Sequence, residues 1–395
     1  MKTLNDKLQL LQTKLLNTDE RVKIMIIGLG SVGLYLLDYL VSMAEPRMEI
    51  IVVGRNYDKM LSDVNIVKTA ATIRRQMRAT IHIEGNCNLE NADNIASVLK
   101  KWDPDFIVNS SRVYSGIKYG SISWSHLRAY GIWTPLSVKF AKKIMEAYEN
   151  ADSHAISINT SYSDVVIPWL KSAGMSYFDF GSGNLNHLIP RMKFYIAEKF
   201  GINNLNDIDV TLAVSHFHDV VISKEGHSEG QDILLDIKYQ GETLDFDKKE
   251  LLEACKIAMP VDQKRNMMNA SSNFDIINSI LIALRDKKQI KIHTPGVNGE
   301  IGGYPFIIDG GGKAKGYIDE TVFSLEEMRK ANRNSIYFDG IDNVGNGILI
   351  YTDELIEKVK KEFGCILVKQ VKLDISNETA SFLIKEIVEP CVNIK

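Results

Sequence analysis

The chain has 395 residues, of which 45% are hydrophobic and 25% are charged, as is ordinary for a globular protein of about two domains. A net charge of −3 argues against a broad electrostatic attraction to nucleic acid. No apolar run reaches the roughly 18 residues of a transmembrane helix, so we expect neither nucleic acid nor a membrane as a partner.

The first 20 residues predict an added helix in front of the first domain. Its leucines form one stripe at helical spacing, namely Leu4, Leu8, Leu11 and Leu15. Polar residues interrupt the segment every few positions, unlike the apolar core of a signal peptide. The stripe packs either on its own subunit or on a second copy, and the spacing does not distinguish the two. Because an apolar stripe needs a cover, we expect a homo-oligomer, most simply a two-fold dimer.

Residues 21–160 alternate between strand-like and helix-like segments. Short β-branched runs predict buried parallel strands at residues 22–27, 49–53, 79–83, 105–109 and 155–159. Helical patterns lie between them at residues 32–43, 57–77, 91–101 and 133–150. This alternation is typical of a doubly wound parallel α/β sheet.

After residue 160 the pattern is mixed. Helices are expected at 164–172, 187–200 and 274–287, with a short strand at 177–180 and a β-rich stretch at 208–223 and 233–239. Glycines cluster at 296–312, where sheet loops fit better than a second phosphate loop because no helix start follows directly. The last residues predict a strand (348–351), a helix (353–363), a strand (365–373) and a helix (378–388). We therefore expect a mixed α+β substrate domain over 161–335 and a C-terminal α/β extension over 336–395.

The four cysteines lie far apart in the sequence. They are Cys87, Cys255, Cys365 and Cys391, and their spacing matches no metal-ligand pattern. We expect reduced thiols, a cytoplasmic protein and no metal site.

A glycine-rich loop follows the first predicted strand. Residues 23–40 read KIMIIGLGSVGLYLLDYL and place Gly28, Gly30 and Gly33 in the spacing G-x-G-x-x-G. The first glycine allows a tight turn, the second lets the backbone approach a pyrophosphate, and the third lets the helix pack closely on the strand. The pyrophosphate would bind the free N–H groups at the helix start, around Ser31 and Val32. Residues 21–160 are therefore predicted to be a Rossmann dinucleotide-binding domain.

The end of the second strand indicates which dinucleotide is bound. NAD-binding domains usually place Asp or Glu here to bond the ribose 2′-hydroxyl. This chain has Gly54 followed by Arg55 and Asn56. A small residue leaves room for a 2′-phosphate, and an arginine offers it charge-assisted hydrogen bonds. We expect NADP(H) in preference to NAD(H), with Arg55 and Asn56 among its contacts.

The order of these segments resembles the lactate/malate dehydrogenase superfamily. The similarity runs from about residue 22 to residue 332, and the remainder has no counterpart in that family. The best stretch is residues 181–202, GSGNLNHLIPRMKFYIAEKFGI, which is similar to the family's glycine-led segment. The resemblance implies hydride transfer between a nicotinamide cofactor and a small 2-hydroxy or 2-oxo carboxylic acid.

The resemblance also implies roles for residues of this stretch. Arg191 falls on the family's substrate-carboxylate arginine, and a guanidinium fork suits a carboxylate in fixed orientation. One turn earlier, the family has an Asp that orients its catalytic histidine, whereas this chain has Leu188. Asn186 and His187 are the nearest polar candidates, and we take Asn186 for the orienting role.

The family's proton-transferring histidine ends a strand at nearly the distance at which His216 follows Arg191. The resemblance therefore assigns proton transfer to His216. His218 would share the face of His216 if the strand continues. His227 lies in EGHSEG, which is similar to a short histidine motif of the family. Both remain alternatives, as does a purely structural role for His216.

Two further contacts follow from the resemblance. The family places an Asn beside the nicotinamide at the end of the fifth strand, where this chain has Asn159, with Ser161 as the alternative, and Ser110 follows the fourth strand. The loop after the fourth strand, residues 109–131, takes the place of the family's mobile substrate lid. It offers Arg112 and Arg128, either of which could polarise a carbonyl, and we take Arg128 as the candidate.

Together these residues predict an NADP(H)-dependent oxidoreductase. In this hypothesis Arg191 fixes the substrate carboxylate, a lid arginine polarises the carbonyl, and His216 donates the proton. Two alternatives remain open. An opine- or saccharopine-type enzyme would reduce an imine formed from an amine and an oxo acid, and a degenerate relative would bind NADP(H) without turnover.

Overall fold

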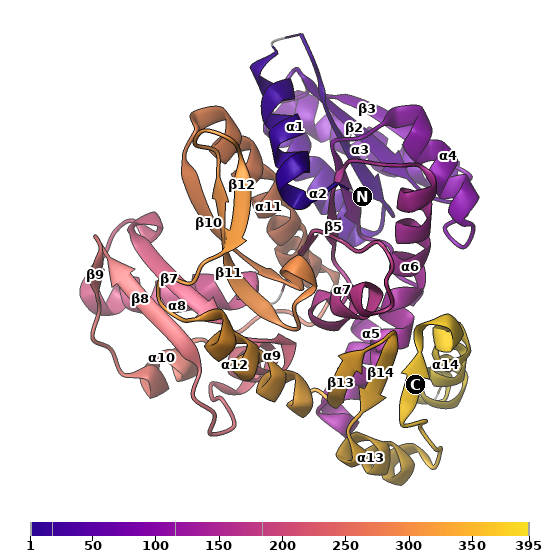
Figure 1. Ribbon diagram of the computed structural model, residues 1–395, viewed down its shortest axis with the longest axis vertical. Coiled ribbons are helices and arrows are strands. Elements are labelled where there is room, and N and C mark those ends of the chain that lie inside the picture. The colour runs from indigo at the N-terminus through magenta and orange to yellow at the C-terminus, as the bar shows by residue number, and fades with distance from the viewer. Residues whose placement is uncertain (1, 18, 115, 184, 394–395) are drawn as a thin grey trace.

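Six parallel strands form the central sheet, in the order β3-β2-β1-β4-β5-β6. The computed structural model describes residues 2–17, 19–114, 116–183 and 185–393. The strands are β1 (Val22–Ile27), β2 (Met48–Val53), β3 (Thr80–Glu84), β4 (Phe106–Asn109), β5 (Ile156–Asn159) and β6 (Phe180–Gly181). Helices cover both faces of this sheet (Figure 1), among them α2 (Ser31–Ser42), α3 (Tyr57–Ile73), α4 (Ala92–Trp102) and α6 (Thr134–Asn150). The order reverses between β1 and β4, which confirms the predicted doubly wound class.

Residues that alternate along a strand enter two different cores. In β1, Met25 and Ile27 pack with residues of α4 and α6, whereas Ile24 and Ile26 pack with residues of α2 and α3. Successive side chains of a strand point to opposite faces, so a strand covered on both faces is apolar at every position. For this reason the continuous apolar runs of the sequence predict these strands.

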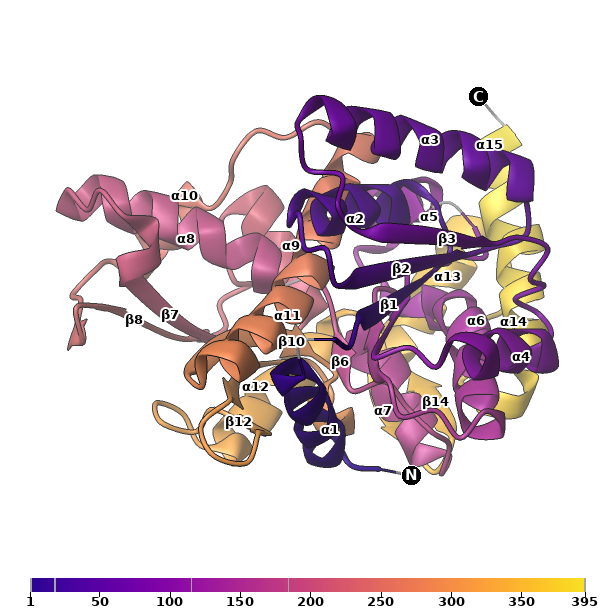
Figure 2. The same cartoon turned by 90° about the horizontal axis from the view of Figure 1, so that it is seen from above.

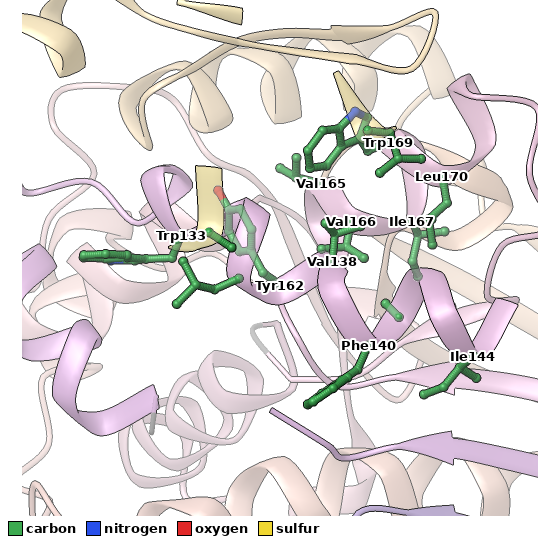
Figure 3. Close-up of a cluster of buried hydrophobic side chains, with 14 of the residues drawn as sticks. Trp133, Val138, Phe140, Ile144, Tyr162, Val165, Val166, Ile167, Trp169 and Leu170 are labelled. Carbon is green, nitrogen blue, oxygen red and sulfur yellow. The ribbon is translucent and has the colours of Figure 1, made fainter. Parts of the chain in front are cut away.

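The C-terminal residues share a core with the nucleotide-binding half. Strands β13 (Ile341–Gly345), β14 (Ile348–Tyr351) and β15 (Gln370–Lys372) form an antiparallel sheet beside α7 (Ser163–Ser172), and α14 (Ser376–Leu383) lies against α6. Figure 3 shows buried side chains of α6 and α7 that belong to this core, including Val138 and Trp169. The Trp169 indole donates a hydrogen bond to the carbonyl of Gly347 at 3.0 Å. The residues after the boundary expected at residue 336 therefore pack in the same hydrophobic core as the nucleotide-binding half.

The second half of the chain contains two further antiparallel sheets. One consists of β7 (Ile208–Ala213), β8 (Leu234–Tyr239) and β9 (Glu242–Thr243), and the other of β10 (Gln289–Pro295), β11 (Gly303–Asp309) and β12 (Lys315–Ile318). Around them lie α8 (Leu185–Phe200), α9 (His216–Glu225), α10 (Lys248–Ala254), α11 (Asn266–Asp286) and α12 (Leu325–Phe338). No described helix combines the length and apolar content that a membrane crossing needs.

One expected strand is replaced by a helix. The sequence predicts a β-rich stretch up to residue 223, but β7 ends at Ala213 and α9 begins at His216. Ser215 is in an extended conformation and occupies the N-cap position. The buried residues Phe217 and Val221 are four apart, which is helical spacing. This correction changes the geometry expected around His216.

The N-terminal helix α1 (Leu4–Leu16) packs on its own chain. Leu8 and Leu11 are buried in the core that also contains residues of α11 and β12. Lys7, with a side chain only 2% exposed, pairs with Asp179 at 2.8 Å. Figure 2 shows α1 beside the second half of the chain, near α11 and β12. The leucine stripe is therefore covered within one subunit, which removes the reason for expecting a homo-oligomer, and the oligomeric state itself stays a prediction.

Replacing Lys7 with Ala should destabilise the fold strongly. Among the described residues, the Asp179 carboxylate would keep hydrogen bonds only from the backbone and hydroxyl of Ser157 and would remain largely buried. Removing one partner of a buried ion pair costs about 3 kcal/mol of unfolding free energy. Lys358→Ala, which removes an exposed pair with Glu354, should cost much less. Equal urea midpoints for the two variants would contradict the buried role of Lys7.

Candidate active site

The glycine loop between β1 and α2 has the geometry that a pyrophosphate-binding turn requires. Gly28 has a φ of +95°, and a Cβ there would lie 2.8 Å from the Cα of Ser111. A Cβ on Gly33 would lie 2.2 Å from the carbonyl oxygen of Gly28, so only glycine lets α2 approach the strand this closely. Around Gly30 the space is open, which leaves its backbone accessible to a ligand. Each glycine thus fits the part expected of it in holding a dinucleotide.

A cavity of about 950 Å³ opens at the carboxyl ends of the central strands. Its lining crosses the sheet from Gly54 after β2, past Ser110 after β4, to Thr160 after β5 and Ser182 after β6. Ligands of open α/β sheets bind outside the carboxyl ends where the strand order reverses, which is between β1 and β4 here. Most of the predicted cofactor residues line this cavity, namely Gly28, Gly30, Ser31, Val32, Arg55, Asn56 and Ser110.

The wall after β2 is basic. Arg55 and Lys59 both line it, and the carboxylates among the described lining residues, Asp219 and Asp262, come from the second half of the chain. Asn56 caps α3, because its side-chain oxygen accepts a hydrogen bond from the backbone of Lys59 at 3.0 Å. Lys59 is paired with Asp63 at 2.6 Å, whereas Arg55 forms no ion pair among the described residues, and an arginine suits a phosphate better than a neutral ribose hydroxyl.

Asn159 does not line the cavity. Its buried side chain accepts a hydrogen bond from Asn109 at 2.9 Å and donates to the carbonyl of Ser161 at 2.9 Å and to the hydroxyl of Ser163 at 3.0 Å. Through these hydrogen bonds the Asn159 side-chain amide connects β5 to β4 and to the start of α7. The structure therefore corrects the predicted cofactor contact at Asn159, and the neighbouring Thr160 lines the cavity instead.

His216 lies in the first turn of α9 and faces the cavity. Its Nδ1 is 2.9 Å from Oδ2 of Asp339, which directly follows α12. Asp339 is almost fully buried and also accepts hydrogen bonds from the Tyr162 hydroxyl at 2.7 Å and the Tyr130 backbone at 2.6 Å. When a buried carboxylate binds Nδ1 of a histidine, Nε2 is available to bind a ligand.

The surroundings of His216 favour its protonated form. Burial by itself lowers the pKa of His216, but the charge and hydrogen bond of Asp339, helped by Asp164, outweigh burial and leave the pKa above its ordinary value. Burial lowers the pKa of His187 and of His218 to about 4 in each case. Of these three histidines, His216 is the one whose surroundings raise its pKa.

Five buried polar atoms of the cavity wall have no hydrogen-bond partner among the described residues. They are Ser182 Oγ, His187 Nε2, Arg191 Nε, Asp219 Oδ1 and Ser223 Oγ. Buried polar groups are ordinarily paired, so unpaired ones gathered in one wall indicate that a polar ligand completes them. The glycine loop and this wall line the same cavity, which has the donors and acceptors for a dinucleotide and a small polar substrate.

Comparison with known proteins identifies the fold. No family model matches the chain, and no curated protein matches its sequence. The lactate dehydrogenase of Cryptosporidium parvum, determined with lactic acid and nicotinamide adenine dinucleotide, matches 80% of this chain and 95% of its own, with a TM-score of 0.53 and 14% identity. The chain has the lactate/malate dehydrogenase fold.

Two further structures agree with this result. The Aeropyrum pernix malate dehydrogenase matches 80% of this chain and 97% of its own, with a TM-score of 0.50 and 17% identity. The Eimeria maxima lactate dehydrogenase, determined with NADH and oxamate, matches 81% of this chain and 94% of its own, with a TM-score of 0.50 and 15% identity. At such identities the similarity concerns the fold alone.

The two alternative histidines lie outside the cavity lining of this lactate/malate dehydrogenase fold. His218 is buried, and its Nδ1 lies 2.8 Å from the hydroxyl of Ser335. Because α9 is a helix, residues two apart do not share a face, so the expectation that His218 lies beside His216 is wrong. His227 is half exposed, with its Nε2 2.9 Å from Glu225.

Arg191 lines the cavity from α8, as the resemblance implied. Its Nη1 donates hydrogen bonds to the carbonyls of Ser223 and Cys255 at 3.0 and 3.1 Å. Burial lowers the pKa of Arg191, while the charge of Asp219 partly opposes this effect. The guanidinium is thus fixed in place with its Nε still unpaired.

Asn186 does not take the orienting role expected of it. It donates a hydrogen bond to the hydroxyl of Ser272 at 3.0 Å and does not line the cavity. Leu188, where the family has its Asp, is fully buried in an apolar core. The carboxylate that holds His216 comes from Asp339 instead.

The segment after β4 forms α5 (Gly116–Ile122) and a π-helical turn (Ser123–Leu127). Arg112, at the start of this segment, lines the cavity, and its Nη1 lies 3.3 Å from the Tyr119 hydroxyl. Arg128 does not line the cavity, because its guanidinium pairs with Glu225 and Glu229. The structure therefore corrects the choice of Arg128 and favours Arg112, the other lid arginine.

Three residues of the site are not predicted from the sequence: Asp339, Tyr162 and Asp219. Asp339 is 123 residues from His216 and lies beyond the region of family resemblance, so no local pattern connects the two. Asp219 follows His216 by three residues, and recognising the helical spacing of Phe217 and Val221 would have placed Asp219 and His216 on one face.

Proposed function

We propose that this protein is a nicotinamide-dependent oxidoreductase that acts on a small 2-oxo or 2-hydroxy carboxylic acid. The observation that carries this proposal is the His216–Asp339 pair, which faces the same cavity as the glycine loop. Proteins of this fold determined with NAD or NADH and with lactic acid or oxamate support the cofactor class and the substrate class.

The residues of this chain supply the proton donor and the groups that bind the substrate in such a reaction. Bound nicotinamide supplies or accepts the hydride. Protonated His216 donates a proton from Nε2 to the substrate oxygen during reduction and recovers it during oxidation. Asp339 holds Nδ1 and stabilises the charged ring, while Arg112 polarises the carbonyl and Arg191 meets the carboxylate.

The proposed preference for NADP(H) rests on the wall after β2. The similar structures were determined with NAD or NADH, so support for NADP(H) comes from this chain's own residues. Gly54 stands where an acid would bond the ribose, and Arg55 and Lys59 line the same wall. A 2′-phosphate would meet Arg55 there, and the Glu84 carboxylate at the end of β3 is paired with Lys101 and lies outside the cavity lining.

The pH dependence of turnover tests the His216–Asp339 pair. In the reduction direction His216 must be protonated, so kcat should be full below the pKa of His216 and fall as the pH rises through it. Asp339→Asn removes the charge that raises this pKa. We therefore expect the descending limb of the kcat profile to move to lower pH, with NADPH affinity nearly unchanged.

Tyr162→Phe is the matched control for this experiment. It deletes one hydrogen bond to the same carboxylate but leaves the negative charge of Asp339 in place. It should therefore not move the limb to lower pH. A limb that stays in place in Asp339→Asn would show that His216 does not control proton transfer.

A further inference from the structure

Asp219 is a buried carboxyl group of the cavity wall that the proposed mechanism does not use. It lies on α9 three residues after His216, so the two side chains share one face of the helix. Only 4% of Asp219 is exposed, and its Oδ1 has no hydrogen-bond partner within the described part of the chain. Burial raises the pKa of Asp219 to about 7, although the charges of His216 and Arg191 oppose this rise.

Two of the three cations whose charges act on Asp219, Arg191 and His216, are held by other groups, and the third, Arg265, forms no ion pair with Asp219 within 4.0 Å among the described residues. Arg191 donates to the carbonyls of Ser223 and Cys255, and His216 is held by Asp339. Across the described residues, neither cation forms an ion pair with Asp219 within 4.0 Å. A buried carboxylate without a donor is costly, so the unpaired Oδ1 indicates a place for a donor carried by a ligand.

We infer that the substrate presents an amino group, which Asp219 binds while His216 and Arg191 hold the oxo-acid end. This inference rests on the proposed function, because it concerns the substrate of the same site. A plain 2-oxo acid offers only acceptor oxygens, which the ionised form of Asp219 cannot bond, whereas a bound ammonium group favours that ionised form. An ammonium group offers up to three N–H donors and the opposite charge.

The amino group has two possible sources. It can be part of the oxo acid itself, at the end remote from the carboxylate. It can also belong to a second reactant, whose amine condenses with the carbonyl and releases one water. The resulting imine then takes up one hydride from the reduced nicotinamide and one proton, and a secondary amine is formed. In the first case the ammonium group would bind Asp219, and in the second the protonated imine would donate its N–H to Asp219.

Matched probes test this inference. NADPH consumption is measured with a 2-oxo acid that bears a terminal amino group, with its hydroxyl counterpart of equal length, and with the unsubstituted acid. The unsubstituted acid is also assayed with an added amino acid, which distinguishes a second reactant from a single one. We expect kcat/KM to be roughly 10- to 100-fold higher where an amino group is supplied.

Asp219→Asn should remove this advantage. The variant keeps the size of the side chain but loses its charge, so kcat/KM for the amino probe should fall roughly 10- to 100-fold, mainly through KM. Turnover of the unsubstituted acid should change much less. Asp236→Asn is the matched control, because Asp236 on β8 also has a buried oxygen without a hydrogen-bond partner in the described structure, with Lys238 3.9 Å away, but lies outside the cavity.

Calorimetry separates failure of this inference from failure of the proposed function. Titration of the amino probe should show tighter binding to the wild type than to Asp219→Asn, with equal NADPH affinities. If the hydroxyl probe works as well as the amino probe, or if Asp219→Asn affects both alike, the inference is wrong and the proposed function stands. If no probe consumes NADPH, the proposed function is wrong, and the titrations alone decide whether Asp219 binds an amino group.

Discussion

Replacing His216 with Gln should lower kcat by a factor of roughly 100 or more and leave the Kd of NADPH nearly unchanged. Glutamine can keep a hydrogen bond to Asp339, but it cannot give and recover a proton near neutral pH as an imidazole can. The effect should therefore fall on the chemical step. Steady-state kinetics of NADPH consumption and a fluorescence titration of NADPH measure the two quantities.

His218→Gln and His227→Gln are the controls for this variant. Both residues lie outside the cavity lining, so both variants should retain most of the turnover per folded molecule. His218 is buried against Ser335, so its replacement should lower stability rather than kcat. Full activity in His216→Gln, together with loss of activity in either control, would show that another histidine transfers the proton.

Replacing Gly54 with Asp should reverse the order of cofactor affinities. The new carboxylate would repel a 2′-phosphate and offer a partner to a free ribose hydroxyl, so NADPH should bind at least roughly tenfold more weakly and NADH more tightly. A Cβ at Gly54 would lie 2.7 Å from the sulfur of Met60, so this flexible side chain must move in the variant.

Gly54→Asn separates the charge from this steric effect. Asparagine has nearly the same shape as aspartate, so Met60 must move to the same extent, but no repulsive charge is added. NADPH should therefore keep its advantage in Gly54→Asn. Equal binding of NADH and NADPH to the unmodified protein would contradict the role given to Arg55.

The central sheet could be predicted because its signals are local. Each buried strand is a short apolar run, and Gly33 of the fingerprint is required by a contact within a few residues, with the carbonyl oxygen of Gly28. The helix α9 was missed because His216 and Ser215 follow an apolar strand, and the helical spacing of Phe217 and Val221 begins only after it. The register of the two histidines was wrong for the same reason.

The remainder of the site depends on contacts between distant parts of the chain. Asp339 reaches His216 because α12 ends beside the start of α9, and neither sequence segment contains a sign of the other. Likewise, the sequence does not show which lid arginine faces the cavity, because that depends on the acids Glu225 and Glu229 that pair with Arg128. Tertiary packing decides both outcomes.

Consumption of NADPH by the unmodified protein tests most directly whether this chain is an oxidoreductase. The loss of NADPH absorbance is followed with a panel of small 2-oxo acids, each with and without an added amino acid, and His216→Gln serves as the blank. We predict consumption that depends on the oxo acid and is nearly abolished in His216→Gln. Tight NADPH binding without consumption by any member of the panel would contradict this prediction and identify a dinucleotide-binding protein without turnover.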